Sequence, residues 1–140
     1  MELGGKSPQI VFSDADLDVA LPVILNAIVQ NAGQTCSAGS RLLVEEKLYN
    51  DFVPVLAERF SELQAGSSDM NFDLGPLISS SQRDRVIGYL NGAETDKIPI
   101  LAQGKINKSV PKGGFYLAPV LLGPVPRDNR LASEEIFGPV

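Results

Sequence analysis

The stretch that organises this chain is Gly33-Gln34-Thr35-Cys36-Ser37-Ala38-Gly39-Ser40-Arg41, which holds the single cysteine of a 140-residue sequence. Small and polar residues surround Cys36 on both sides, so the segment is too polar and too flexible for the interior of a helix or strand. We therefore predict a loop. It would join a helix-like apolar segment that ends near Asn31 to a strand that starts at Arg41, and reactive side chains are often displayed on such loops.

Two interpretations of Cys36 follow from its surroundings. Free cysteine is among the most buried residue types, which favours an inert structural thiol. The polar neighbours favour a nucleophile instead, which would act as its thiolate. The sequence has one cysteine and no histidine, which excludes an internal disulfide and a histidine-containing zinc site, so we expect no metal chemistry. On the residues alone, both interpretations of Cys36 stay open.

Helix-like and strand-like segments alternate outward from this loop. The predicted helices cover residues 16–31, residues 49–63 and a segment capped by Ser79 or Ser80, and the predicted strands cover residues 9–12, 41–45, 98–102 and 115–122. Ser13 or a neighbouring aspartate would cap the first helix. This order predicts an α/β fold of three layers, in which helices flank a largely parallel sheet. We expect a single domain over residues 1–140.

Two prolines interrupt the predicted helices. Beyond the first helical turn, proline removes one backbone hydrogen bond and clashes with the carbonyl four residues earlier. We therefore expect a kink or a later helix start at Pro22, and we expect Pro54 to fall within the first turn of its helix.

Composition and charge narrow the class of protein. Hydrophobic residues make up 44% and charged residues 21%, as is usual for globular proteins. The net charge is −5 and the 12 lysines and arginines are scattered, which argues against a nucleic-acid partner. No apolar run approaches the roughly 20 residues of a membrane span, and no secretory signal is present. We expect no membrane partner, and a cytoplasmic location.

Three stretches together resemble signature motifs of the NAD(P)-dependent aldehyde dehydrogenases. They are Glu2-Leu3-Gly4-Gly5-Lys6-Ser7-Pro8, Gly33-Gln34-Thr35-Cys36 and Glu134-Glu135-Ile136-Phe137-Gly138-Pro139-Val140, in the family's order. The resemblance covers the whole chain and implies a fragment of the catalytic domain, because the chain opens on one motif and stops inside another. No Gly-x-Gly-x-x-Gly fingerprint occurs, so we expect the dinucleotide-binding domain to be absent from this chain.

The resemblance implies that the complete protein oxidises a small-molecule aldehyde to a carboxylic acid with NAD or NADP. Cys36 would attack the aldehyde to form a thiohemiacetal, and loss of hydride would leave a thioester. Glu2 would be the general base that activates water to hydrolyse the thioester, since a carboxylate in a largely apolar pocket suits proton transfer near neutral pH.

The resemblance also implies which residues contact the cofactor. They are Leu3, Gly4, Glu135 and Phe137, with Glu135 on the nicotinamide ribose and Phe137 against the nicotinamide. A carboxylate can accept hydrogen bonds from two neighbouring hydroxyls, and glycine allows a backbone to approach a ligand closely. The choice between NAD and NADP stays open.

Other functions also stay open. An acylating enzyme of the same family would pass the thioester to coenzyme A, although Glu2 favours hydrolysis. A non-catalytic scaffold would bury Cys36 as a structural thiol, and a cysteine hydrolase would lack the histidine that its nucleophile normally uses. We expect the isolated chain to be inactive or nearly so, and the full-length protein to be a homo-oligomer.

Overall fold

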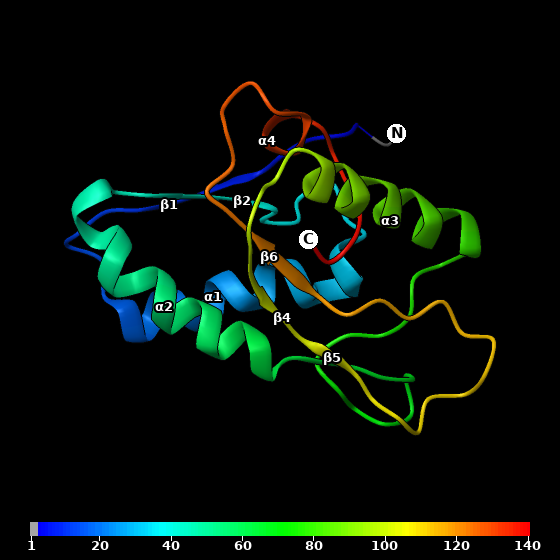
Figure 1. Cartoon of the computed structure of the whole chain (residues 1–140). Helices are drawn as coiled ribbons and strands as arrows, with labels where there is room; N and C mark the ends of the chain where they lie inside the picture. Colours follow the sequence, from blue (N-terminus) through cyan, green and yellow to red (C-terminus); the bar gives the residue numbers. More distant parts are fainter. Residues whose placement is uncertain (1–2) are drawn as a thin grey trace.

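The computed structural model describes residues 3–140, in which helices alternate with short strands (Figure 1). In chain order the elements are β1 (Pro8–Val11), α1 (Leu17–Val29), the 3₁₀ turn η1 (Gln30–Gly33), β2 (Arg41–Val44), α2 (Glu46–Glu62), β3 (Gln64–Ala65), α3 (Ser80–Thr95), β4 (Ile100–Gln103), β5 (Lys105–Ile106), β6 (Val120–Leu122) and α4 (Arg130–Ser133). The predicted α/β class, with parallel strands and flanking helices, is confirmed. Each helix within the described range is too short or too polar to span a membrane.

The strands of residues 3–140 are arranged as three separate pairs. β1 pairs in parallel with β2, β3 pairs in parallel with β5, and β4 pairs antiparallel with β6. The strands are only two to four residues long. Each therefore offers few backbone hydrogen bonds, and helices and loops connect the pairs. The sequence predicted neither β3 nor β5, nor the bridge between Ala65 and Leu74.

Side-chain caps define where two of the helices begin. The Asp16 carboxylate accepts hydrogen bonds from the backbone N–H groups of Asp18 and Val19, and Ser79 Oγ accepts one from Gln82 N at 3.1 Å. These bonds satisfy donors that have no partner inside the helix. Of the predicted caps, Ser13 or an aspartate for α1 and Ser79 or Ser80 for α3, the structure selects Asp16 and Ser79.

Both prolines lie inside helices. α1 continues through Pro22 without a later start, and α2 begins at Glu46, so Pro54 lies in its middle and the expectation for Pro54 is wrong. Both prolines are exposed, and the carbonyls four residues earlier belong to the exposed residues Asp18 and Asn50. Water can therefore satisfy the carbonyls that lose a helical hydrogen bond.

Two apolar clusters hold the elements together. In the smaller one, Phe52 and Leu56 of α2 pack with Val11 of β1 and Ile24 of α1. The larger cluster joins the ends of α1 and α2 to α3 and the C-terminal segment, and it includes Ile28, Phe60, Val86, Tyr89, Leu131 and Ile136. Because α1 contributes to both clusters, the position of its C-terminal end is fixed by packing on both.

The chain turns sharply where α1 ends. Asn31, Ala32 and Gly33 have φ values of 50°, 54° and 72°, in the left-handed region that favours glycine. A Cβ added to Gly33 would also collide with the carbonyl oxygen of Gly138. The turn therefore needs glycine at position 33, and it delivers the chain to the loop of Cys36.

We expect Gly33→Ala to lower the free energy of unfolding by about 1 to 3 kcal/mol, because it adds backbone strain and a steric clash. Gly88→Ala is the matched control: Gly88 lies inside α3 and an added Cβ would meet no atom within 4 Å. That change should raise the free energy of unfolding by about 0.5 to 1 kcal/mol. Urea unfolding measures both, and effects of the same sign would contradict this account.

Candidate active site

Cys36 lies in the loop between η1 and β2, and its side chain is exposed. The predicted loop is confirmed. The exposed thiol favours the nucleophile over the alternative of a buried structural cysteine. Exposure is what a nucleophile requires, because its substrate must reach the sulfur.

Hydrogen bonds hold this loop at both ends. Asn31 Nδ2 donates to Gln34 O at 2.9 Å, and Gln34 Nε2 donates back to Asn31 O at 3.0 Å. Gln34 Oε1 accepts from Ile78 N at 2.9 Å. On the other side of the cysteine, Gln9 Nε2 of β1 donates to Gly39 O at 2.9 Å. The cysteine is thus displayed from a braced loop.

The N-terminal motif lies between the cysteine loop and the C-terminal motif. Ser7 Oγ donates to Cys36 O at 3.2 Å, and Gly5 N donates to Glu135 Oε1 at 3.1 Å. A Cβ added to Gly4 would lie 3.0 Å from Glu135 Oε2, so glycine allows the backbone to lie close against this carboxylate. The three motifs, which are far apart in the sequence, therefore meet in one place.

Side chains of α3 hold the backbone of the C-terminal motif. Gln82 Nε2 donates to Ile136 O at 3.3 Å and to Phe137 O at 2.8 Å, and Arg85 donates to Glu135 O at 2.8 Å. Gln82 and Arg85 are three residues apart, which places them on the same face of the helix. Sequence reasoning missed both residues, although their spacing was visible. No feature of the neighbouring sequence indicated that they contact a segment about 50 residues away.

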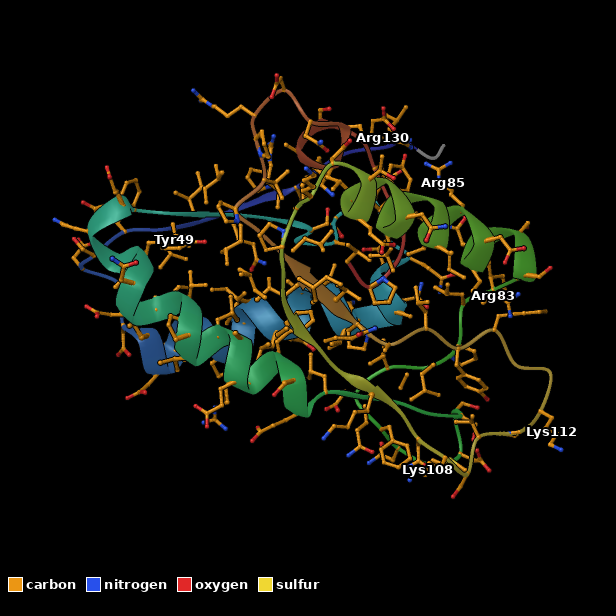
Figure 2. The ribbon with its side chains drawn as sticks, in the orientation of Figure 1. Tyr49, Arg83, Arg85, Lys108, Lys112 and Arg130 are labelled. Atoms are coloured by element: carbon orange, nitrogen blue, oxygen red, sulfur yellow. The ribbon has the colours of Figure 1, made fainter. Side chains whose placement is uncertain are left out.

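A second group of contacts fixes the neighbouring Glu134. Tyr89 Oη donates to Glu134 Oε2 at 2.9 Å, and Arg130 pairs with the same carboxylate at 3.3 Å. The guanidinium carbons of Arg130 and Arg85 lie 4.2 Å and 5.8 Å from the centre of the Tyr89 ring. Figure 2 shows Arg85 and Arg130 close together, where α3 approaches α4. Packing and charge together hold this end of the motif.

Lys6 and Arg41 bring positive charge beside the same motif. The pKa of Lys6 falls from 10.5 to about 8, because burial and, to a smaller extent, the charge of Arg41 lower it more than the charge of Glu135 raises it. Arg41 donates to Ala132 O at 3.3 Å, whereas its buried Nε has no hydrogen-bond partner within the described residues. Both cations line a cavity of about 550 Å³.

Comparison with known proteins agrees with this arrangement. The sequence profile described as "Aldehyde dehydrogenase family" matches residues 1–140. The chain belongs to the aldehyde dehydrogenase family. It is 56% identical to a Burkholderia cenocepacia protein assigned as an aldehyde dehydrogenase, with a TM-score of 0.97 over 99% of this chain and 29% of that one.

Two further solved structures of the family are similar. One is a betaine aldehyde dehydrogenase from Staphylococcus aureus in complex with NAD⁺, at 34% identity and a TM-score of 0.91. The other is an aldehyde dehydrogenase from Bacillus cereus, at 36% identity and a TM-score of 0.87. Each match covers 99% of this chain and 28% of the other protein. The chain thus spans less than a third of the length of the aldehyde dehydrogenases that it matches.

The structure brings together some of the predicted site residues. Gly4 and Glu135 are in contact, and Cys36 lies in the loop that Ser7 contacts. Phe137 is half-buried with φ of 61°, and Leu3 is exposed. Glu2 lies outside the described residues, so its place relative to Cys36 stays a prediction, as do the roles of the other five. Residues 3–140 contain no cluster of three or more side chains suited to a metal ion.

The isosteric change Gln82→Glu tests the brace on the C-terminal motif. It removes both amide donors and sets a carboxylate against two carbonyl oxygens, so we expect the free energy of unfolding to fall by about 1 to 3 kcal/mol. Gln103→Glu, at an exposed position of β4, adds the same charge and should change it by less than about 0.5 kcal/mol. Comparable losses for the two variants in chemical unfolding would refute the brace.

The lowered pKa of Lys6 predicts a particular pH dependence. Between about pH 8 and 10.5 the unfolded chain keeps the lysine proton that the folded chain has lost, so the stability of the fold should rise with pH across this window. Below pH 8 this contribution is constant. We expect Lys6→Met to remove the rise and Lys112→Met, in an exposed loop, to keep it. Thermal unfolding from pH 7 to 10 measures the difference, and identical profiles for all three proteins would exclude it.

Proposed function

We propose that this chain is a catalytic-domain segment of an enzyme that oxidises an aldehyde to a carboxylic acid with NAD⁺ or NADP⁺. The observation that supports it best is the meeting of three motifs. Ser7 donates a hydrogen bond to the backbone carbonyl of the exposed Cys36, and Gly5 donates one to the carboxylate of Glu135. Family membership agrees with this function.

In the proposed reaction, the Cys36 thiolate attacks the aldehyde carbon and forms a thiohemiacetal. The negative charge that develops on the former carbonyl oxygen needs hydrogen-bond donors, and the backbone N–H of Cys36 is one candidate. The carbon then loses a hydride and becomes a thioester. Water attacks this thioester, the sulfur leaves as thiolate, and the carboxylic acid is released.

Glu2 is the proposed general base for the hydrolytic step. It would take a proton from the attacking water, and it precedes the backbone that contacts both Cys36 and Glu135. This role favours hydrolysis over transfer of the acyl group to coenzyme A. The acylating enzyme is therefore the second candidate.

The residues near Glu135 fit a dinucleotide ribose. Glu135 Oε1 accepts one backbone hydrogen bond, while Oε2 lies against a glycine that has no side chain to cover it. Glu135 would accept hydrogen bonds from ribose hydroxyls, with Leu3 and Gly4 beside it and Phe137 against the nicotinamide. When bound, the nicotinamide accepts the hydride. Arg85 and Gln82 would keep this backbone in position.

The remainder of the enzyme is part of the same proposal. Because the chain spans 28–29% of the solved relatives, we assign the dinucleotide-binding domain to polypeptide outside these 140 residues. We expect the 140-residue chain alone to be inactive or nearly so. We place the complete enzyme in the cytoplasm as a homo-oligomer that uses no metal ion.

A chimera provides the test. These 140 residues would replace the matched segment of the Burkholderia cenocepacia protein, with NAD(P)H formation from an aldehyde as the measurement. We expect the chimera to be active, Cys36→Ser to lower its turnover by at least about 1,000-fold, and Ser37→Ala, the adjacent control, to retain turnover within about tenfold. Glu2→Gln should slow release of the carboxylic acid.

Three outcomes would count against the proposal. The first is an active chimera whose Cys36→Ser variant keeps its rate. The second is enzyme-like turnover by the 140-residue chain alone, which would contradict its expected inactivity. The third is a requirement for coenzyme A with acyl-coenzyme A as the product, which would select the acylating enzyme.

A further inference from the structure

Gln34 lies two residues before Cys36, and its side chain is half-buried. Its backbone N–H and its side-chain Nε2 both donate to Asn31 O, at 3.1 Å and 3.0 Å, and its backbone carbonyl accepts from Asn31 Nδ2 at 2.9 Å. The other atom of the side-chain amide, Oε1, accepts from the backbone N–H of Ile78 at 2.9 Å. The two backbone groups of Gln34 and both ends of its amide therefore have partners.

These hydrogen bonds join a turn to a helix. Asn31 belongs to the left-handed turn that ends α1, and its three bonds with Gln34 close this turn. Ile78 directly precedes Ser79, the residue that caps α3. α3 itself is fixed in the larger apolar cluster, in which Val86 and Tyr89 are buried. The amide of Gln34 thus ties the end of α1 to the start of a well-packed helix.

Cys36 lies inside a turn that begins directly after Gln34. Ala38 N donates to Thr35 O at 3.2 Å, which closes the turn around the cysteine. The backbone N–H of Cys36 donates to no group of residues 3–140, so it is available to the oxyanion of the proposed reaction. The bond within the turn fixes Cys36 relative to its neighbours. Its position relative to the rest of the molecule depends on the contacts at either side of the turn.

The contacts at the two sides of the turn come from different elements. Ser7 and Gln9, which lie just before and within β1, bond the carbonyls of Cys36 and Gly39. Gln34 supplies the contact with the start of α3, four residues before Gln82, which holds the carbonyls of residues 136 and 137. Through α3, the side chain of Gln34 therefore connects the cysteine turn to the segment proposed to hold the cofactor.

We propose that Gln34 is a positioning residue, which fixes Cys36 relative to the proposed cofactor segment by tying the cysteine turn to the start of α3. This inference rests on the proposed function, and it adds a residue that touches neither the aldehyde nor the cofactor. Release of the turn would misplace the carbon bound to Cys36 relative to the nicotinamide, and hydride transfer depends steeply on that geometry. An amide suits this position because it supplies a donor and an acceptor at once.

Amide hydrogen exchange in the 140-residue chain tests the contact itself. Gln34→Met keeps the length of the side chain and removes its amide, so we expect the Ile78 amide to exchange at least about tenfold faster. Gln34→Glu keeps an oxygen that accepts from Ile78 N and should retain most of the protection. Gln103→Met, at an exposed position of β4, is the matched control and should leave the exchange of Ile78 unchanged.

Turnover of the chimera described above tests the role of Gln34. We expect Gln34→Met to lower kcat per folded molecule by about 10- to 100-fold, to leave KM for the aldehyde within about threefold, and Gln103→Met to change neither. Gln34→Glu keeps one of the two side-chain bonds and should have an intermediate kcat. With deuterium on the aldehyde carbon, Gln34→Met should show an isotope effect no smaller than that of the unsubstituted chimera, because hydride transfer is the slowed step.

Three outcomes would overturn the inference. Equal exchange of the Ile78 amide in the unsubstituted and Gln34→Met chains excludes the contact. A Gln34→Met chimera with a lower melting temperature and an unchanged kcat per folded molecule, where Cys36→Ser abolishes turnover, limits Gln34 to stabilising the fold. A smaller isotope effect places the lost rate in hydrolysis of the thioester. Retention of the rate by Cys36→Ser is a different result, because it contradicts the proposed function itself.

Discussion

The close contact between the backbones of Gly33 and Gly138 is the constraint on which this structure depends. A side chain at Gly33 would collide with the Gly138 carbonyl, and a side chain at Gly138 would collide with Val86 of α3. The end of α1 and the C-terminal segment therefore pack backbone against backbone, and the C-terminal segment packs against the Val86 side chain of α3. Because the cysteine loop follows Gly33 directly, this packing also decides on which side of the molecule Cys36 appears. A local steric requirement thus sets the geometry of the whole candidate site.

Around that contact, helix side chains replace the hydrogen bonds that a sheet would normally supply. Residues 135–137 belong to no strand or helix, and Phe137 has a left-handed backbone with φ of 61°. Gln82 and Arg85 satisfy their carbonyl groups from α3. These hydrogen bonds hold the main chain of residues 135–137 and do not involve the side chains of Glu135 and Phe137. A segment bonded this way is well suited to present side chains to a ligand.

Charge is distributed unevenly over the molecule despite a net charge of −5. Glu134 forms an ion pair with Arg130 and accepts a hydrogen bond from Tyr89, and Glu135 accepts a hydrogen bond from the backbone of Gly5. Lys6 and Arg41, on the side of the open cavity, have no carboxylate of residues 3–140 within ion-pair distance. The carboxylates of the C-terminal motif therefore have partners within the described residues, and the charge of Glu135 also favours the protonated form of Lys6.

The sequence by itself determined the α/β class, the regions in which α1 and α3 are capped, the loop around Cys36 and the three motifs, because each depends on neighbouring residues and on short-range periodicity. Only the tertiary structure decided that Gly5 bonds Glu135 across 130 residues, that α3 holds the C-terminal motif, and that exposed prolines remain within helices. Those features depend on which surfaces meet and which backbone groups reach water. No local sequence pattern encodes contacts between such distant segments, because these contacts arise from the packing of the whole chain.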